Sequence, residues 1–118
     1  HAIQTKLEKV ISYTKQTMVA YMSEEDLNRL CAYIVEYSSG DTLQKVSPVK
    51  VDSQLKSIDI MHFGWNIGKA FGRKRIHTAT FIKNVFADAL RGLEISTIER
   101  KMSHTESVCH IKLNGNLS

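Results

Sequence analysis

The chain has 118 residues and a net charge of +4, a size that suits one domain around one hydrophobic core. Its hydrophobic content of 42% and charged content of 24% are ordinary for a globular protein, which argues against a disordered or fibrous chain. Because the sequence contains no apolar run of roughly 18 residues, we expect no membrane-spanning helix. We therefore interpret residues 1–118 as a single compact domain.

The first two predicted elements are helices. Apolar side chains recur at spacings of three and four from Ile3 to Met22, which predicts a long amphipathic helix. Ser23 then has the character of an N-cap, and the acidic residues 24–26 suit the positive end of a second helix. Gly40 follows the last apolar position of that helix and can adopt the left-handed conformation of a helix stop.

Residues 41–52 precede the longest apolar stretch of the chain. The alternation of Val46, Val49 and Val51 fits either an extended strand or a loop, and Pro48 argues against a central strand. Either Asp52 or Ser53 is suited to cap the helix that follows.

The central element is predicted to be a helix over residues 53–71. Its core, residues 58–71, is apolar on two faces and contains the only tryptophan, which is typical of a helix buried between neighbours. Gly64 and Gly68 would allow another backbone to approach closely. His62 on this helix is interpreted as a hydrogen-bonded core histidine.

The last third of the chain predicts two more helices and a strand. Thr78 is suited to cap a fourth helix that stops at Gly92, and Ser96 with Glu99 resembles a capping box for a short fifth helix. Residues 108–113 (VCHIKL) alternate as a short strand does. The predicted fold is therefore mainly α, with about five helices around the central helix and a short C-terminal strand.

Positive charge is concentrated in the second half of the chain. Residues 1–60 carry seven Lys or Arg and eight Asp or Glu, whereas residues 61–118 carry nine and four. A run of basic residues free of acids, Lys69, Arg73, Lys74 and Arg75, lies at the end of the central helix. Such asymmetry favours a polyanionic partner, although a soluble surface and a helix C-terminus account for the same charges.

The segment Gly92 to Met102, GLEISTIERKM, resembles the turn and recognition helix of helix-turn-helix DNA-binding proteins. The similarity lies in Gly92 at the turn, in the apolar residues Leu93 and Ile98, and in the polar residues Ser96, Thr97 and Arg100. It implies a helix-turn-helix over residues 78–104, in which Ser96, Thr97, Arg100 and Lys101 approach DNA. A plain helical hairpin has the same spacing of apolar residues. The segment HFGWNIGKAF (62–71) followed by LEISTIERKM (93–102) is also similar to small uncharacterised proteins of bacterial mobile elements, which implies no established activity.

The side chains that could act as catalysts or metal ligands do not form a pattern typical of a catalytic or metal site. The five histidines have no metal-binding helical spacing, and the glycines of the central helix do not form a phosphate-binding loop. We therefore expect no enzyme, cofactor, metal or small-molecule ligand. Cys31 and Cys109 are far apart in the sequence, and a reduced thiol at Cys31 favours the cytoplasm.

The sequence leads to one leading hypothesis of function and two alternatives. The leading hypothesis is a DNA-binding regulatory or accessory protein. Lys69, Arg73, Lys74 and Arg75 would neutralise phosphates, and Ser96, Thr97, Arg100 and Lys101 would approach the groove. The first alternative is a protein-interaction or oligomerisation module, such as a homodimer, that uses the first helix. The second is a terminal domain of a larger protein.

Overall fold

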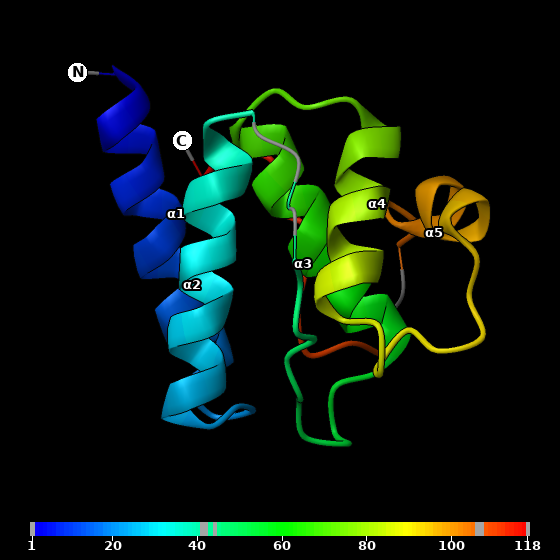
Figure 1. Cartoon of the computed structure of the whole chain (residues 1–118). Coiled ribbons are helices and arrows are strands. Elements are labelled where there is room, and N and C mark those ends of the chain that lie inside the picture. The colour runs from blue at the N-terminus through cyan, green and yellow to red at the C-terminus, as the bar shows by residue number, and fades with distance from the viewer. Residues whose placement is uncertain (1, 41–42, 44, 106–107, 118) are drawn as a thin grey trace.

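A computed structural model describes residues 2–40, 43, 45–105 and 108–117 of the chain. These residues form five helices, which confirms the mainly helical prediction (Figure 1): α1 (Ala2–Met18), α2 (Glu24–Ser38), α3 (Ser57–Ala70), α4 (Arg75–Val85) and α5 (Ile95–Lys101). The paired helices α1 and α2 lie on one side, α3 and α4 in the middle, and α5 on the opposite side.

Helix α3 is the buried centre of the fold, as its apolar sequence predicted. Ten of its fourteen residues are buried, and it packs against both α1 and α4. Gly64 and Gly68 face α4, where the side chains of Ile82 and Thr78 lie directly over them. The neighbour that approaches Gly64 and Gly68 closely is therefore not another backbone, as predicted, but two side chains of α4. The missing Cβ atoms of the glycines leave the space that these side chains fill.

The predicted ends of α2 are confirmed. The hydroxyl of Ser23 accepts a hydrogen bond from the Asp26 N–H at 3.1 Å, and Gly40 has φ of 88°. Helix α1, however, ends at Met18 rather than continuing to Met22. The chain turns there, and the Tyr21 carbonyl instead accepts the N–H of Asp52 at 2.7 Å.

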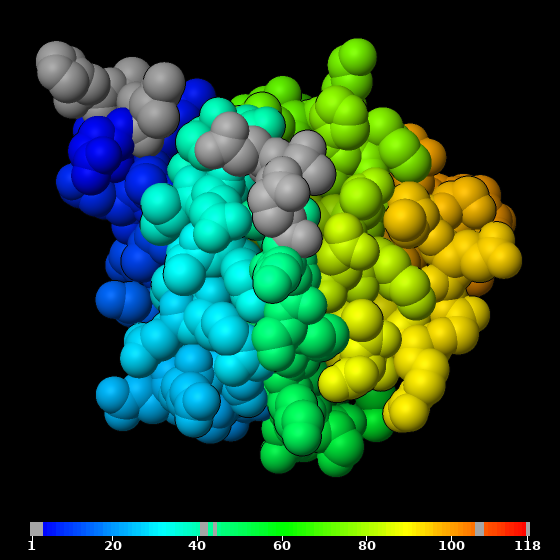
Figure 2. Space-filling view, in the orientation of Figure 1, coloured from blue at the N-terminus to red at the C-terminus, as the bar shows by residue number. Residues whose placement is uncertain are grey.

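Residues 45–51 form an extended segment between α2 and α4, where Figure 2 shows them filling the surface between these helices. Arg29 of α2 donates to the carbonyls of Ser47 and Pro48, at 3.2 and 2.8 Å. On the other side, the Val49 N–H donates to the Val85 carbonyl at 2.9 Å. The segment thus holds α2 and α4 together through its backbone, and the buried Val49 fills the space beneath it.

Three predicted helix caps are wrong, and in each case the helix begins elsewhere. Helix α3 begins at Ser57, and Asp59 in its first turn accepts the Lys56 N–H at 3.0 Å, whereas Asp52 forms a separate turn with Gln54. Helix α4 begins at Arg75, so Thr78 lies inside it, where its side chain is buried against Gly68 and hydrogen-bonded to Tyr37 at 2.8 Å.

The third wrong cap is Ser96, which lies inside α5. The N-cap residue of this helix is Glu94, whose carbonyl accepts the Ile98 N–H at 3.0 Å. The fourth helix also ends earlier than predicted, at Val85, so that turns from Phe86 to Glu94 connect α4 to α5. Gly92 lies in this connection with φ of 85°, as a turn glycine should.

The predicted strand at residues 108–113 is also wrong, since this described segment is held by polar side chains of α3. Asp59 accepts the N–H groups of His110 and Ile111, at 2.6 and 3.0 Å. Asn66 accepts the Asn114 N–H and donates to the Lys112 carbonyl, at 2.6 and 2.9 Å. The backbone groups that a neighbouring strand would use are therefore satisfied by a helix.

His62 is a hydrogen-bonded core histidine, as predicted. Its side chain is 1% exposed, and its Nδ1 and Nε2 lie 2.8 and 2.6 Å from the carbonyl oxygens of Ile111 and His104. Asp59, His62 and Asn66 thus attach the C-terminal segment along one side of α3.

Candidate nucleic-acid interface

The eight residues proposed to contact nucleic acid are distributed over three places. Lys69 is exposed in the last turn of α3, on the side of Trp65 and Gly115. The turn after Gly72 (φ of 66°) leads the chain from α3 into α4 and carries Arg73 and Lys74, and Arg75 is the first residue of α4. Ser96, Thr97, Arg100 and Lys101 lie on α5.

Arg73 is directed away from α5, towards the end of α2. Its Nη2 donates to the carbonyls of Tyr37 and Ser38, at 3.1 and 2.9 Å. Its guanidinium also lies 5.7 Å from the centre of the Tyr37 ring, a cation–π distance. Arg73 therefore stabilises the negative C-terminal end of α2 from the turn between α3 and α4, a structural role that competes with phosphate binding.

Arg75 connects the start of α4 to the end of α5. Its Nη1 donates to the Ser103 hydroxyl at 2.9 Å, and its Nη2 donates to the Glu99 carbonyl. Ser103 was not identified from the sequence, because a lone serine after a helix has no distinctive pattern. These two hydrogen bonds hold the start of α4, with residues 74–75, against the end of α5, where residues 100–101 lie, although the two segments are far apart in the chain.

Helix α5 lies at the surface and is anchored by its apolar residues. Ile98 is completely buried, and Met102 directly after the helix is nearly so. Ser96, Arg100 and Lys101 are exposed, whereas Thr97 is half-buried. Because α5 has only seven residues, it offers about two turns for contact with a partner.

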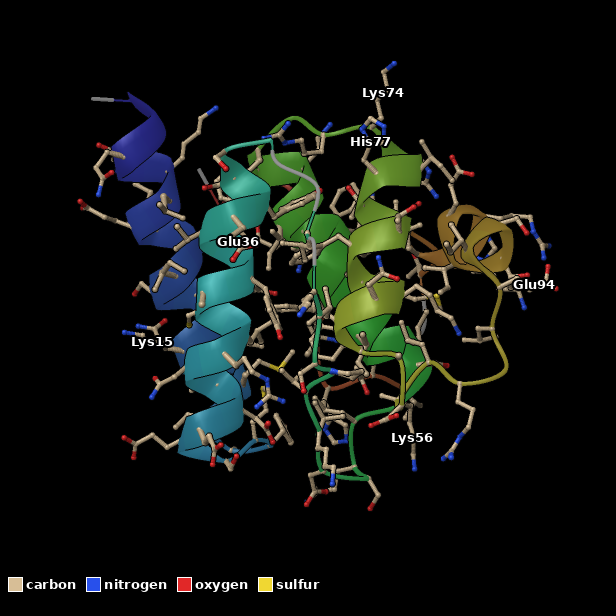
Figure 3. All side chains as sticks on the ribbon, in the orientation of Figure 1. Lys15, Glu36, Lys56, Lys74, His77 and Glu94 are labelled. Atoms are coloured by element: carbon tan, nitrogen blue, oxygen red, sulfur yellow. The ribbon has the colours of Figure 1, made fainter. Side chains whose placement is uncertain are left out.

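Among the described residues, no acidic side chain forms an ion pair with the positive charges at these two helix ends. Within the described part of the chain, the one salt bridge joins Arg29 to Asp26 at 2.9 Å, inside α2. Figure 3 shows Lys74 extending from the start of α4 into solvent, whereas Glu94 lies at the far end of α5. We define the basic face as Lys74, Arg75, Arg100 and Lys101.

The apolar stripe of α1, which the alternative hypothesis would use for a partner, packs within the domain. Val10, Thr14 and Met18 are completely buried against the rest of the protein. None of the described helices combines the length and the apolar character that a membrane span requires. Among the described residues, no three His, Cys, Asp or Glu side chains converge as metal ligands would.

Comparison with protein-family models, with curated proteins and with solved structures finds no match to this chain. The function must therefore be inferred from its own residues.

Proposed function

We propose that the protein binds nucleic acid, as a regulatory or accessory DNA-binding protein of the cytoplasm, through the basic face. The observation that supports this most directly is the connection made by Arg75 between the start of α4 and the Glu99–Ser103 region. It places four cationic side chains at two adjoining helix ends. A cationic cluster without acidic partners attracts a polyanion and releases its counterions on binding.

The side chains of the basic face have different roles in this proposal. Lys74, Arg100 and Lys101 are exposed and make the phosphate contacts. Arg75 is held by α5, so it adds charge and fixes the relative position of the two helix ends. Lys69 and Arg73 lie outside the face and contribute only long-range attraction.

The distribution of charge along α5 determines how DNA approaches it. Glu94 is exposed at the start of the helix, and Arg100 and Lys101 are exposed at its end. In a helix-turn-helix protein, the start of the recognition helix contacts the base edges. We propose that in this protein the end of α5 makes the dominant contacts, to phosphates, and that sequence reading by Ser96 and Thr97 contributes less.

Fluorescence anisotropy with a labelled random-sequence duplex tests this proposal at roughly 50 and 200 mM salt. Three phosphate contacts predict that the association constant falls about 40-fold between these two concentrations. Absence of binding at the lower salt concentration would contradict the proposal. Binding that is equally strong at both concentrations would mean that phosphate contacts do not cause it.

A further inference from the structure

Near its C-terminal end the chain forms a tight turn at Asn114 and Gly115. The Asn116 N–H donates to the side-chain oxygen Oδ1 of Asn114 at 2.9 Å, which closes an Asx turn. All three residues are exposed, so water and hydroxide reach both the side-chain amide of Asn114 and the peptide that follows it.

Helix α3 holds this turn from one side. The Asn66 side chain accepts the Asn114 N–H at 2.6 Å and donates to the Lys112 carbonyl at 2.9 Å. Gly115 lies against the indole of Trp65, since a Cβ added to Gly115 would be 3.6 Å from Cη2 of that ring. Asn114 is therefore fixed through its own N–H, whereas its side chain and the next peptide face solvent.

An asparagine followed by a glycine contains an electrophile and a nucleophile that can react with each other. The electrophile is the side-chain carbonyl carbon Cγ of Asn114. The nucleophile is the main-chain nitrogen of Gly115 after it has lost its proton. Their reaction closes a succinimide ring, and glycine hinders this closure least because it has no Cβ.

The Asx turn supplies two features that favour this reaction. It folds the Asn114 side chain back over the peptide that follows, to which the Gly115 nitrogen belongs. The Asn116 N–H also points at Oδ1, the atom on which negative charge develops when the nitrogen adds to Cγ. A donor already directed at a developing oxyanion stabilises the transition state.

We propose that Asn114–Gly115 is a self-modification site, at which the folded chain deamidates without an enzyme. The Gly115 nitrogen gives its proton to hydroxide and bonds to Cγ, and the bond from Cγ to the side-chain nitrogen breaks, so that this nitrogen leaves as ammonia. Water then opens the succinimide at either of its two carbonyl carbons, which leaves aspartate or isoaspartate at position 114. The net change is one water taken up and one ammonia released, so the reaction requires no oxidant, reductant or cofactor.

Isoaspartate at this position changes how the end of the chain lies on α3. Its main chain runs through the former side chain, so the Asx turn is lost and a free carboxylate stands next to the N–H that Asn66 accepts. The peptide after position 114 is then displaced from Trp65. Because Trp65 is the only tryptophan of the chain, its fluorescence reports this displacement.

Incubation of the purified protein at mildly alkaline pH, followed by peptide mass spectrometry, tests the proposal. We expect aspartate and isoaspartate to accumulate at Asn114, and the fluorescence of Trp65 to change with the same time course. Asn28 and Asn84 are internal controls, because both are exposed but lie within the helices α2 and α4. They should remain amides. An intact Asn114, or equal conversion at the three positions, would overturn the proposal.

Three variants separate the roles of the two residues after Asn114. Gly115→Ala should slow deamidation about tenfold or more, because the new Cβ hinders the attacking nitrogen. The fold should tolerate this change, since Gly115 has no positive φ and the Cβ would meet Trp65 at an ordinary contact distance. Asn116→Pro removes the N–H directed at Oδ1 and should slow the reaction about fivefold relative to Asn116→Ala, which keeps it.

The same pair of Asn116 variants, unfolded in urea, shows whether the folded turn is responsible. In the unfolded chain the N–H has no fixed position, so the two variants should deamidate at nearly equal rates. Equal rates in the folded proteins, an equal difference in urea, or an unaffected Gly115→Ala variant would each contradict the proposed reaction at this turn.

Discussion

Arg75 and Ser103 are joined by a hydrogen bond of 2.9 Å from the guanidinium Nη1 to the hydroxyl oxygen, and this bond connects the start of α4 to the residues after α5. The same guanidinium donates to the Glu99 carbonyl in the last turn of α5. One side chain thus stabilises the C-terminal end of α5 and holds it against α4. Together with the buried residues Ile98 and Met102, this contact holds the two parts of the basic face in place.

Arg75→Ala should therefore loosen α5 before it affects the rest of the fold. Two hydrogen bonds at a largely exposed site predict a loss of about 1 kcal/mol in the free energy of unfolding. Amide hydrogen exchange should increase most at Ile98 and Met102, whose N–H groups bond within this region. Arg91→Ala removes an exposed arginine of the α4–α5 connection and serves as the control. Equal exchange in both variants would show that Arg75 does not hold α5.

The contact of α3 with α4 depends on the two glycines of α3. A Cβ added at Gly64 would lie 2.9 Å from Cδ1 of Ile82, too close for a real contact. Gly64→Ala should therefore destabilise the protein by about 2–3 kcal/mol, as overpacking of a core does. In a double-mutant cycle, Ile82→Ala should relieve part of this cost, so that the double variant loses less than the sum.

Gly92→Ala is the control for this experiment, because an added Cβ there meets no atom within 4 Å in the described structure. Its φ of 85° costs an alanine about 1–2 kcal/mol through the backbone alone. Its effect should be independent of Ile82→Ala. Simple additivity of Gly64→Ala with Ile82→Ala, measured by urea unfolding, would contradict the packing described for α3 and α4.

Alkaline pH should destabilise the protein through Tyr37. Burial raises the pKa of Tyr37 above its ordinary value of 10.0, and the hydrogen bond with Thr78 and the charge of Arg73 counter this only in part. A phenol whose pKa is higher in the folded state contributes stability that is complete below about pH 10 and is lost as the pH rises through the folded pKa. Between the unfolded-state and the folded-state pKa of Tyr37, the free energy of unfolding falls by about 1.4 kcal/mol per pH unit.

Tyr37→Phe separates this effect from other titrations. At pH 8 it should destabilise the protein by about 1 kcal/mol, because the Thr78 hydrogen bond is lost. Above pH 10 the difference from the wild-type protein should shrink, since phenylalanine cannot ionise. Urea unfolding at several pH values measures this directly. A constant difference between pH 8 and pH 11 would contradict the assigned burial.

The sequence predicted the elements that depend on local chemistry. The apolar residues 58–71 indicated the central helix, and Ser23 and Gly40 marked the ends of α2. The caps predicted for the other helices were wrong, because a residue suited to a cap can instead make a tertiary contact, as Thr78 does with Tyr37. The C-terminal segment was predicted wrongly because alternation at residues 108–113 does not reveal what pairs with the backbone. The available signal was the polar row Asp59, His62 and Asn66 on an otherwise apolar helix.

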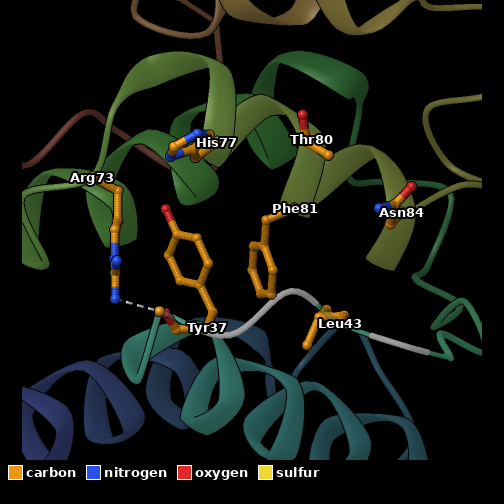
Figure 4. Close-up of a pocket in the computed structure, with 8 residues that line it drawn as sticks. Tyr37, Leu43, Arg73, His77, Thr80, Phe81 and Asn84 are labelled. Carbon is orange, nitrogen blue, oxygen red and sulfur yellow. Dashed lines mark hydrogen bonds between the residues drawn. The ribbon is translucent and has the colours of Figure 1, made fainter.

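The candidate site was predictable only as two separate groups of cations. Spacing along the chain does not show that Arg75 reaches Ser103, or that Arg73 turns instead to the end of α2 (Figure 4).

The most direct test of the basic face compares two matched double variants in the duplex-binding experiment. Lys74→Gln with Lys101→Gln removes two charges from the face, and Lys6→Gln with Lys9→Gln removes two exposed lysines from α1 on the opposite side of the molecule. The first variant should reduce the slope of log K against log salt by about 1.8, as two lost phosphate contacts require, whereas the second should leave the slope nearly unchanged. Equal slopes in the two variants would contradict a basic face at α4 and α5.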